Sequence, residues 1–161
     1  MPQIKNKLML NLVLVISIFV LIVAYFIEHI LKYEPCNLCL IERFPYIIAI
    51  IIISICFFLK KFEKIAFLLL TLIFVSGIFI SFYHVGIEKG FFEESFLCNS
   101  NNKSNILTKE DLLKELQKKV ISCKNVDFAI FGFSLASINS IVSIILSIIT
   151  LKKYLNYEKS K

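Results

Sequence analysis

Long apolar runs separated by short polar segments dominate the pattern along the chain. A helix needs about 18 or more consecutive apolar residues to cross roughly 30 Å of hydrocarbon. Three runs reach that length directly, from about Leu8 to Ile27, from Ile65 to Tyr83 and from Phe128 to Leu151. These three runs predict membrane-spanning helices.

A fourth apolar run needs a further argument because it is short. Counted from Phe44 to Leu59, it gives only about 24 Å of helix, so we expect its helix to begin further back, near Leu38 to Ile41. Pro45 then falls near the second turn, where a proline costs less than at mid-helix because few carbonyls precede it. This placement puts Cys36 and Cys39 at a helix N-terminus.

The expected fold is therefore an all-α membrane protein, a four-transmembrane-helix bundle that forms one domain over residues 1–161. We expect its helices at about 8–30, 38–59, 65–85 and 128–151, and its two outer loops at about 31–37 and 86–127. A cleaved signal peptide is the alternative for the first run. That run is too long and no Ala-x-Ala site follows it, so it is retained as a membrane helix.

The long second loop contains a candidate amphipathic helix. Thr108 to Asp111 resembles a capping box that opens a helix. Apolar residues then recur at helical spacing on one face, opposite lysines and glutamates; they are Leu112, Leu113, Leu116 and Val120. We expect a short helix lying on the membrane surface. The same apolar face would also suit docking to a partner or packing against the bundle.

Lysines gather at alternate ends of the four predicted helices and set their orientation. They precede the first helix, fill the turn between the second and third, and follow the fourth: Lys5 and Lys7; Lys60, Lys61 and Lys64; Lys152, Lys153, Lys159 and Lys161. The positive-inside rule then places both termini in the cytoplasm and both loops outside. The net charge of +6 is explained by this topology. Nucleic-acid binding is disfavoured, because these lysines are juxtamembrane and have no interleaved aromatic platform.

The topology divides the five cysteines into two groups. The outer side receives four of them, Cys36, Cys39, Cys98 and Cys123, and an even number is the pattern that an oxidising compartment permits. Cys56 lies inside the second helix, about 25 Å along it from Cys39. We expect Cys56 to behave as a small buried hydrophobic residue.

Two structural roles compete with redox chemistry for the outer cysteines. A zinc site is disfavoured, because structural zinc sites usually pair two close-spaced cysteine motifs, whereas a long segment separates Cys98 from Cys123. Structural disulfides are the stronger alternative. A Cys-x-x-Cys disulfide closes so small a loop, however, that it stabilises the fold little. Haem attachment is disfavoured too, because a leucine and not a histidine follows Cys39.

The residues around the Cys-x-x-Cys motif favour a reactive thiol. On a helix, Cys36, Cys39 and Arg43 stand at i, i+3 and i+7, on one face. A helix N-terminus and a guanidinium both stabilise the thiolate that reacts in disulfide exchange. An arginine so close to hydrocarbon also needs a partner, which Glu42, a neighbouring helix or a polar ligand headgroup can supply.

The Cys-x-x-Cys motif lies within the segment Pro35-Cys36-Asn37-Leu38-Cys39-Leu40-Ile41-Glu42-Arg43. This segment resembles the Pro-Cys-x-Leu-Cys-x-x-Glu-Arg signature of the DsbB family of disulfide bond formation proteins. Members of that family are the quinone-dependent membrane oxidants. Tyr83-His84-Val85-Gly86-Ile87-Glu88 is similar to the end of that family's third helix. Phe131-Gly132 with Ser134-Leu135-Ala136 is similar to the entrance of its fourth helix. The resemblance covers nearly the whole chain.

This resemblance implies a route for electrons from a periplasmic partner into the membrane. A thioredoxin-fold oxidase of the DsbA type attacks the disulfide between Cys98 and Cys123, with Cys98 engaged in the mixed disulfide. Cys123 then bridges back toward Cys36, and Cys39 faces the quinone, ubiquinone or menaquinone. The implied location is the bacterial inner membrane, with the redox loops facing the periplasm.

The resemblance also implies two quinone-binding residues. Arg43 would bind a quinone carbonyl and steady the Cys39 thiolate, and His84 matches a family histidine implicated near quinone. An interfacial aromatic residue at a helix end is the alternative for His84. Glu28 and His29 end the first helix similarly and are interpreted as interfacial residues. No metal is expected in the site.

Two other functions remain open at this stage. A vitamin K epoxide reductase-like protein also joins a membrane Cys-x-x-Cys to quinone chemistry, but its motif lies late in the chain and its loop pair early, the reverse of the order here. The non-enzymatic alternative is a membrane scaffold with disulfide-stapled outer loops. Within the resemblance, the loop between Cys98 and Cys123 is rich in lysine and poor in aromatic residues, which bears on the oxidase it recognises.

Overall fold

The computed structural model describes residues 2–59, 62–93, 98, 123, 129–130 and 132–159. Within these residues, four helical spans are long and apolar enough to cross a membrane: Asn6–His29, Asn37–Phe58, Glu63–Glu88 and Leu135–Asn156. The prediction of an all-α, four-helix membrane bundle is confirmed. The amphipathic helix predicted after Thr108 lies outside the described residues.

Three of the spans belong to single long helices. They are α1 (Pro2–His29), α4 (Glu63–Glu88) and α6 (Leu135–Lys159). Each extends past the bounds expected from hydropathy at one end or both. Helices continue into polar flanks as long as no residue breaks the backbone hydrogen bonding, so an apolar run gives the membrane segment and not the helix ends.

The second span is divided, where a single helix over about 38–59 is predicted. It consists of α2 (Asn37–Ile41) and α3 (Phe44–Phe58), separated by a turn at Glu42 and Arg43. Pro45 has no N–H for the carbonyl of Ile41, and its ring clashes with the carbonyl four residues earlier. The backbone responds with a tighter hydrogen bond from Arg43 N–H to the Leu40 carbonyl, 3.1 Å long.

A short hairpin precedes α6, where the predicted helix at 128–151 would already have begun. Strands β1 (Ala129–Ile130) and β2 (Phe133–Ser134) pair antiparallel, Ala129 opposite Ser134. Gly132 turns the chain at a φ of +82°, a conformation that favours glycine. The Ser134 hydroxyl then accepts a 3.2 Å hydrogen bond from the Ser137 N–H, which caps the start of α6.

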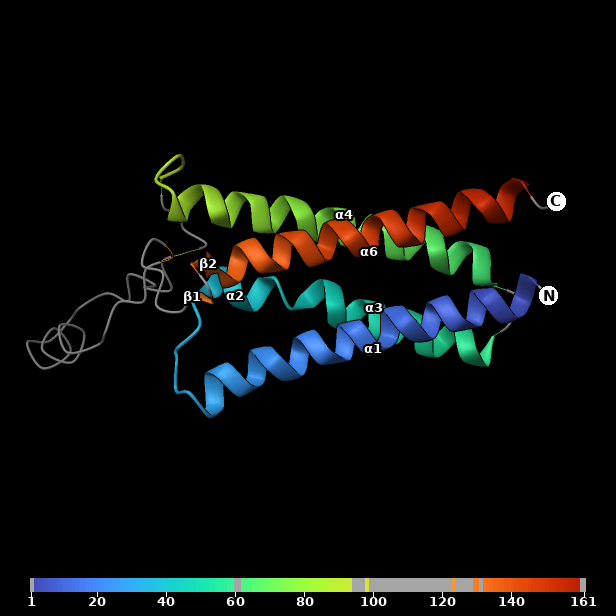
Figure 1. The fold of residues 1–161 in the computed structure, drawn as a ribbon, viewed down its shortest axis with the longest axis horizontal. Coiled ribbons are helices and arrows are strands. Elements are labelled where there is room, and N and C mark those ends of the chain that lie inside the picture. The colour runs from blue at the N-terminus through green and yellow to red at the C-terminus, as the bar shows by residue number, and fades with distance from the viewer. Residues whose placement is uncertain are drawn as a thin grey trace, which may run out of the picture.

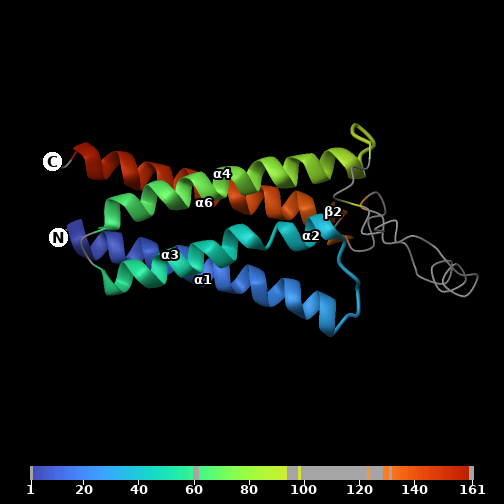
Figure 2. The ribbon, with the colours of Figure 1, turned by 180° about the vertical axis from the view of Figure 1, so that it is seen from behind.

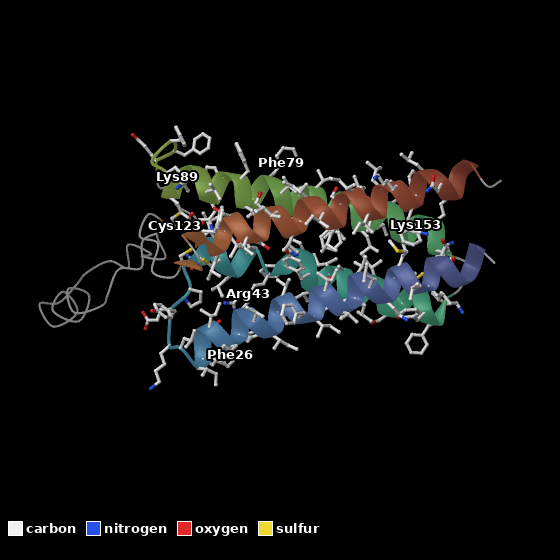
Figure 3. All side chains as sticks on the ribbon, in the orientation of Figure 1. Phe26, Arg43, Phe79, Lys89, Cys123 and Lys153 are labelled. Carbon is white, nitrogen blue, oxygen red and sulfur yellow. The ribbon has the colours of Figure 1, made fainter. Side chains whose placement is uncertain are left out.

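The long helices lie side by side, with both termini at one end of the bundle (Figure 1). The last residues of α3 and the first residues of α4 lie at that same end, and α2 with the hairpin lies at the other (Figures 1 and 2). The helix ends that carry the lysine clusters therefore share one end of the molecule. Lys153 near one end and Lys89 at the other mark this separation in Figure 3.

The core lies between α1, α3, α4 and α6 and is filled by large side chains such as Tyr46, Phe67 and Phe74. Cys56 belongs to this core and is 5% exposed. Outward-facing positions are also apolar: Phe26 and Phe79 point away from the bundle in Figure 3. A helical bundle that is apolar on both its inner and outer faces is suited to a lipid surrounding.

Candidate functional site

All four outer cysteines meet at the end of the bundle that carries α2. Cys36, Cys98 and Cys123 are buried together in one cluster, and Cys39 packs against it. Leu38 of α2 and Ile87 of α4 complete the cluster. The structure thus brings together two cysteine pairs that are separated by roughly sixty residues or more in the sequence.

Cys36 and Cys39 are in direct contact. Their sulfur atoms are 3.0 Å apart, and each residue carries a free thiol. Cys36 is the N-cap of α2, and its sulfur accepts a 3.4 Å hydrogen bond from the Cys39 N–H. The motif therefore sits at a helix N-terminus as expected, although α2 is only five residues long. Because the two sulfurs are already in contact, a disulfide between them needs only a small local movement.

The thiol contacts continue from Cys36 into the second pair. Cys123 is hydrogen bonded both to Cys36 and to Cys98. The hydrogen bonds from Cys123, Cys39 and His84 hold the pKa of the Cys36 thiol well below its usual range. The hydrogen bond with Cys36, together with burial, raises the pKa of Cys123. Cys36 is thus the preferred thiolate and Cys123 the proton-bearing neighbour.

His84 is a basic side chain in contact with Cys36. Its Nε2 lies 3.6 Å from the Cys36 sulfur, and its Nδ1 lies 2.8 Å from Glu42 Oε1. Only 2% of His84 is exposed, so it is a buried site residue and not an interfacial aromatic. When Nδ1 donates its proton to Glu42, Nε2 presents its lone pair to the cysteine, the geometry of a nucleophile, a base and an orienting carboxylate.

A buried polar network holds Glu42 in place. The Asn139 amide nitrogen donates to Glu42 Oε2 at 3.0 Å and to Ser81 Oγ at 2.7 Å. The Tyr46 hydroxyl donates to Asn139 Oδ1 at 2.5 Å. Among the described residues no buried side-chain nitrogen or oxygen lacks a hydrogen-bond partner. The network ties three of the spans to the carboxylate that orients His84.

The sequence analysis gave no role to Asn139, Ser81 or Tyr46. A polar residue inside an apolar span is a recognised signal of function, and Asn139 carries that signal in α6. The contacts of all three depend on how the helices pack, which hydropathy does not encode.

Arg43 finds its partner on a neighbouring helix. Its Nη1 lies 2.5 Å from Glu28 Oε2, and its guanidinium stands 5.1 Å from the centre of the Tyr25 ring. Of the three partners considered for Arg43, α1 supplies the one observed. Glu28, interpreted from sequence as an interfacial residue, pairs with this arginine. Pairing lowers the cost of both charges near hydrocarbon.

These side chains border a cavity of about 330 Å³ between α1, α3 and α6. Its polar end holds the Cys36–Cys39 pair with His84, Glu42 and Arg43. The remainder of its wall is mainly apolar and includes Phe19, Val20, Val23, Ile27, Leu135, Ala136, Ile138 and Val142. A cavity of this size and lining fits an apolar molecule that carries a polar group.

Two comparisons match the chain to known proteins, and one finds no match. The family model described as "Disulfide bond formation protein DsbB" matches residues 6–152. A protein of Rickettsia prowazekii (strain Madrid E), named "Uncharacterized protein RP370", is 33% identical over 154 residues, which are 94% of this chain and 89% of the relative. No solved structure is significantly similar to the chain.

Proposed function

This chain belongs to the DsbB family of disulfide bond formation proteins, which are membrane disulfide oxidoreductases, and we propose that it reoxidises a periplasmic DsbA-type thiol oxidase and passes the electrons to a membrane quinone. The observation that supports this proposal most is the unbroken series of thiol contacts from Cys98 through Cys123 and Cys36 to Cys39. The series ends beside a largely apolar cavity within the bundle.

The order of contacts suggests the order of exchange. A thiolate of the reduced partner attacks Cys98, breaks the Cys98–Cys123 disulfide and leaves Cys123 as the new thiolate. Cys123 attacks Cys36 in the Cys36–Cys39 disulfide and releases Cys39. The second partner thiol then attacks the mixed disulfide at Cys98 and leaves the partner oxidised. The Cys98 thiolate released in this step attacks Cys123, re-forms the Cys98–Cys123 disulfide and releases Cys36. Two electrons and two protons are then held by the Cys36–Cys39 pair and its surroundings.

His84 is placed to move one of these protons. Its Nε2 faces the Cys36 sulfur at 3.6 Å, so it can hold a proton against the Cys36 thiolate until Cys36 re-forms its disulfide with Cys39. Glu42 fixes the ring by its 2.8 Å contact with Nδ1. Asn139 in turn fixes Glu42, which makes Asn139 a positioning residue.

The cavity fits the quinone that the family implies. Its apolar wall suits a quinone ring, its polar end has the Arg43 guanidinium to bind a carbonyl oxygen, and Cys39 borders the same space. A quinone bound there supplies a two-electron, two-proton acceptor for the dithiol. Glu28 keeps Arg43 oriented by an ion pair, and Tyr25 lies against the guanidinium.

The proposed location is the bacterial inner membrane, with the cysteine end toward the periplasm. The lysine-bearing helix ends at the opposite end of the bundle support this orientation. The soluble partner then meets Cys98 and Cys123 from water, while the lipid-soluble acceptor reaches Cys39 from the bilayer.

The test is a reconstituted reaction with the full chain in lipid nanodiscs. Reduced DsbA-type oxidase is mixed with the protein and either ubiquinone or menaquinone, and loss of quinone absorbance is followed. We expect one quinone reduced for each oxidase disulfide formed. Cys39→Ser should abolish the reaction, and Cys56→Ala, in the apolar core, should retain it. Quinone reduction by Cys39→Ser at the wild-type rate would rule out the proposed route.

A further inference from the structure

We infer that the reduced Cys36–Cys39 pair and His84 together form a binding site for a thiophilic divalent metal such as Zn²⁺. This site would exist only while both cysteines are thiols. The inference concerns the reduced protein by itself and does not depend on a quinone or on a partner oxidase.

The three side chains converge from separate parts of the chain. One ligand atom of each, the two sulfurs and a ring nitrogen, lies within 4.8 Å of the other two. Cys36 and His84 are buried, and Cys39 is half-buried. Two thiolates and an imidazole are a ligand set that Zn²⁺ prefers. The zinc site considered from sequence combined the two cysteine pairs. In the structure, His84 lies beside the Cys36–Cys39 pair and could supply the third ligand.

Two of the three distances between the ligand atoms can be compared directly with those of a tetrahedral site. For Zn–S bonds of about 2.3 Å and Zn–N bonds of about 2.0 Å, a sulfur and a nitrogen lie about 3.5 Å apart and two sulfurs about 3.8 Å. The Cys36 sulfur lies 3.6 Å from His84 Nε2 and 3.0 Å from the Cys39 sulfur. The two sulfurs therefore need to separate by less than an ångström, which a small side-chain rotation provides.

The surroundings already orient the histidine as a ligand. Metal-bound histidines usually donate their other ring N–H to a carboxylate, which fixes the tautomer and raises the basicity of the ligating nitrogen. Glu42 Oε1 lies 2.8 Å from His84 Nδ1, on the side away from Cys36. Asn139 holds the other oxygen of Glu42 at 3.0 Å. Nε2 is thus directed at the cysteines by a buried network.

The fourth coordination position of the metal would face the cavity. Cys36, Cys39 and His84 all border the 330 Å³ cavity, so a water molecule could complete the coordination from that side. Glu88 Oε1, 3.9 Å from His84 Nε2, adds negative charge beside the site. Three protein ligands and one exchangeable position suit reversible binding better than permanent structural binding.

Metal binding and disulfide formation exclude each other at this site. Binding of Zn²⁺ requires both sulfurs as thiolates and holds them in that state. Oxidation of the pair joins these sulfurs and removes two of the three ligands. The metal should therefore protect the reduced pair from oxidants, and oxidation should expel the metal.

The first test measures binding of Co²⁺, a coloured substitute for Zn²⁺, to the full chain in detergent without oxygen. The variant Cys98→Ser/Cys123→Ser keeps the second pair from contributing thiolates. We expect one Co²⁺ per reduced chain with the absorption of tetrahedral cobalt thiolate, and none after the Cys36–Cys39 disulfide has formed. No thiolate absorption in the reduced protein would overturn the inference.

The second test uses the two histidines of the chain as a matched pair. His84→Ala should weaken Co²⁺ binding tenfold or more, whereas the exposed His29→Ala should leave it unchanged. Glu42→Gln should weaken binding by a smaller factor through His84. Equal affinity in both histidine variants would remove His84 from the site.

A third measurement on the wild-type protein guards against misfolding of the variants. X-ray absorption of the zinc-loaded reduced chain should give two sulfur ligands with nitrogen or oxygen in the remaining positions. Zn²⁺ should also slow oxidation of Cys36 and Cys39 by diamide, a soluble oxidant, by tenfold or more. A zinc site without sulfur, or oxidation at the same rate with and without Zn²⁺, would contradict the inference.

Discussion

Cys36 is the residue where the contacts of the site converge. It touches Cys39 and Cys123, accepts the α2 N-cap hydrogen bond and faces His84. Each of these contacts favours the thiolate, and together they lower the pKa of Cys36 while that of Cys123 is raised. The site therefore holds its negative charge on the sulfur that joins the two pairs.

This charge distribution predicts a pH dependence for alkylation of the reduced protein by iodoacetamide. A lowered pKa keeps Cys36 deprotonated as the pH falls, so its rate constant should stay nearly flat from about pH 8 to pH 6. Cys123, with a raised pKa, should react more slowly throughout this range. Mass spectrometry of the two peptides gives both rates. A tenfold fall per pH unit at Cys36 would show an ordinary thiol.

Arg43 should act on quinone binding more than on the chemistry of the thiols. Arg43→Ala removes the guanidinium at the polar end of the cavity, and we expect the apparent KM for quinone to rise about tenfold with little change in kcat. Arg43→Lys keeps the charge but not the planar fork, so it should restore only part of the affinity. Steady-state kinetics over a range of quinone concentrations measures both. An unchanged KM in Arg43→Ala would remove Arg43 from the cavity's function.

At this scale, the sequence supports a prediction about the chemistry of the site but not about most of its contacts. The spacing of Cys36, Cys39 and Arg43 was sufficient to indicate a reactive thiol pair. The partner of Glu42 was not predictable, because Glu42 and His84 lie on different helices and meet only through packing. The same holds for Glu28, whose position at a helix end gave no indication that Arg43 would face it.

At the scale of elements, apolar run length predicted where the chain crosses the membrane but not where its helices break. The division between α2 and α3 follows from Pro45, whose cost was judged by its nearness to the helix start. The hairpin before α6 follows from the φ of Gly132, and Ser134 was a capping signal within the predicted helix. The turn between α2 and α3 and the hairpin before α6 both place irregular backbone at the end of the bundle that carries the cysteine cluster.

Gly77 lies where α3, α4 and α6 pack together. A Cβ atom on Gly77 would lie in ordinary contact, 3.4 Å from Pro45 Cγ and 3.4 Å from Ser143 Oγ, so a side chain that extends beyond Cβ would press on both neighbouring helices. Gly77→Leu should destabilise the protein by about 1–3 kcal/mol through overpacking. The lipid-facing Phe79→Leu is the matched control and should have little effect. Thermal unfolding in detergent compares the two, and equal midpoints would contradict this packing.

At the scale of the whole molecule, two kinds of residue are separated between the two ends of the bundle. Lysines cluster at the helix ends near the termini, and both cysteine pairs gather at the other end. Hydropathy and charge were sufficient to predict this separation, because each crossing of the membrane reverses the direction of the chain. The depth of the cavity between the helices was not predictable, since it depends on side-chain packing.

In the proposed function, Cys36 and Cys39 lose their electrons to a quinone. Thiol trapping in cells with a mass-tagging maleimide, in a Cys56→Ala background, tests this claim most directly because each tag then reports one of the four clustered cysteines. We predict that cells depleted of respiratory quinone accumulate reduced Cys36 and Cys39, while quinone-replete cells keep the pair oxidised. The same oxidation state of this pair in both kinds of cell would contradict the account.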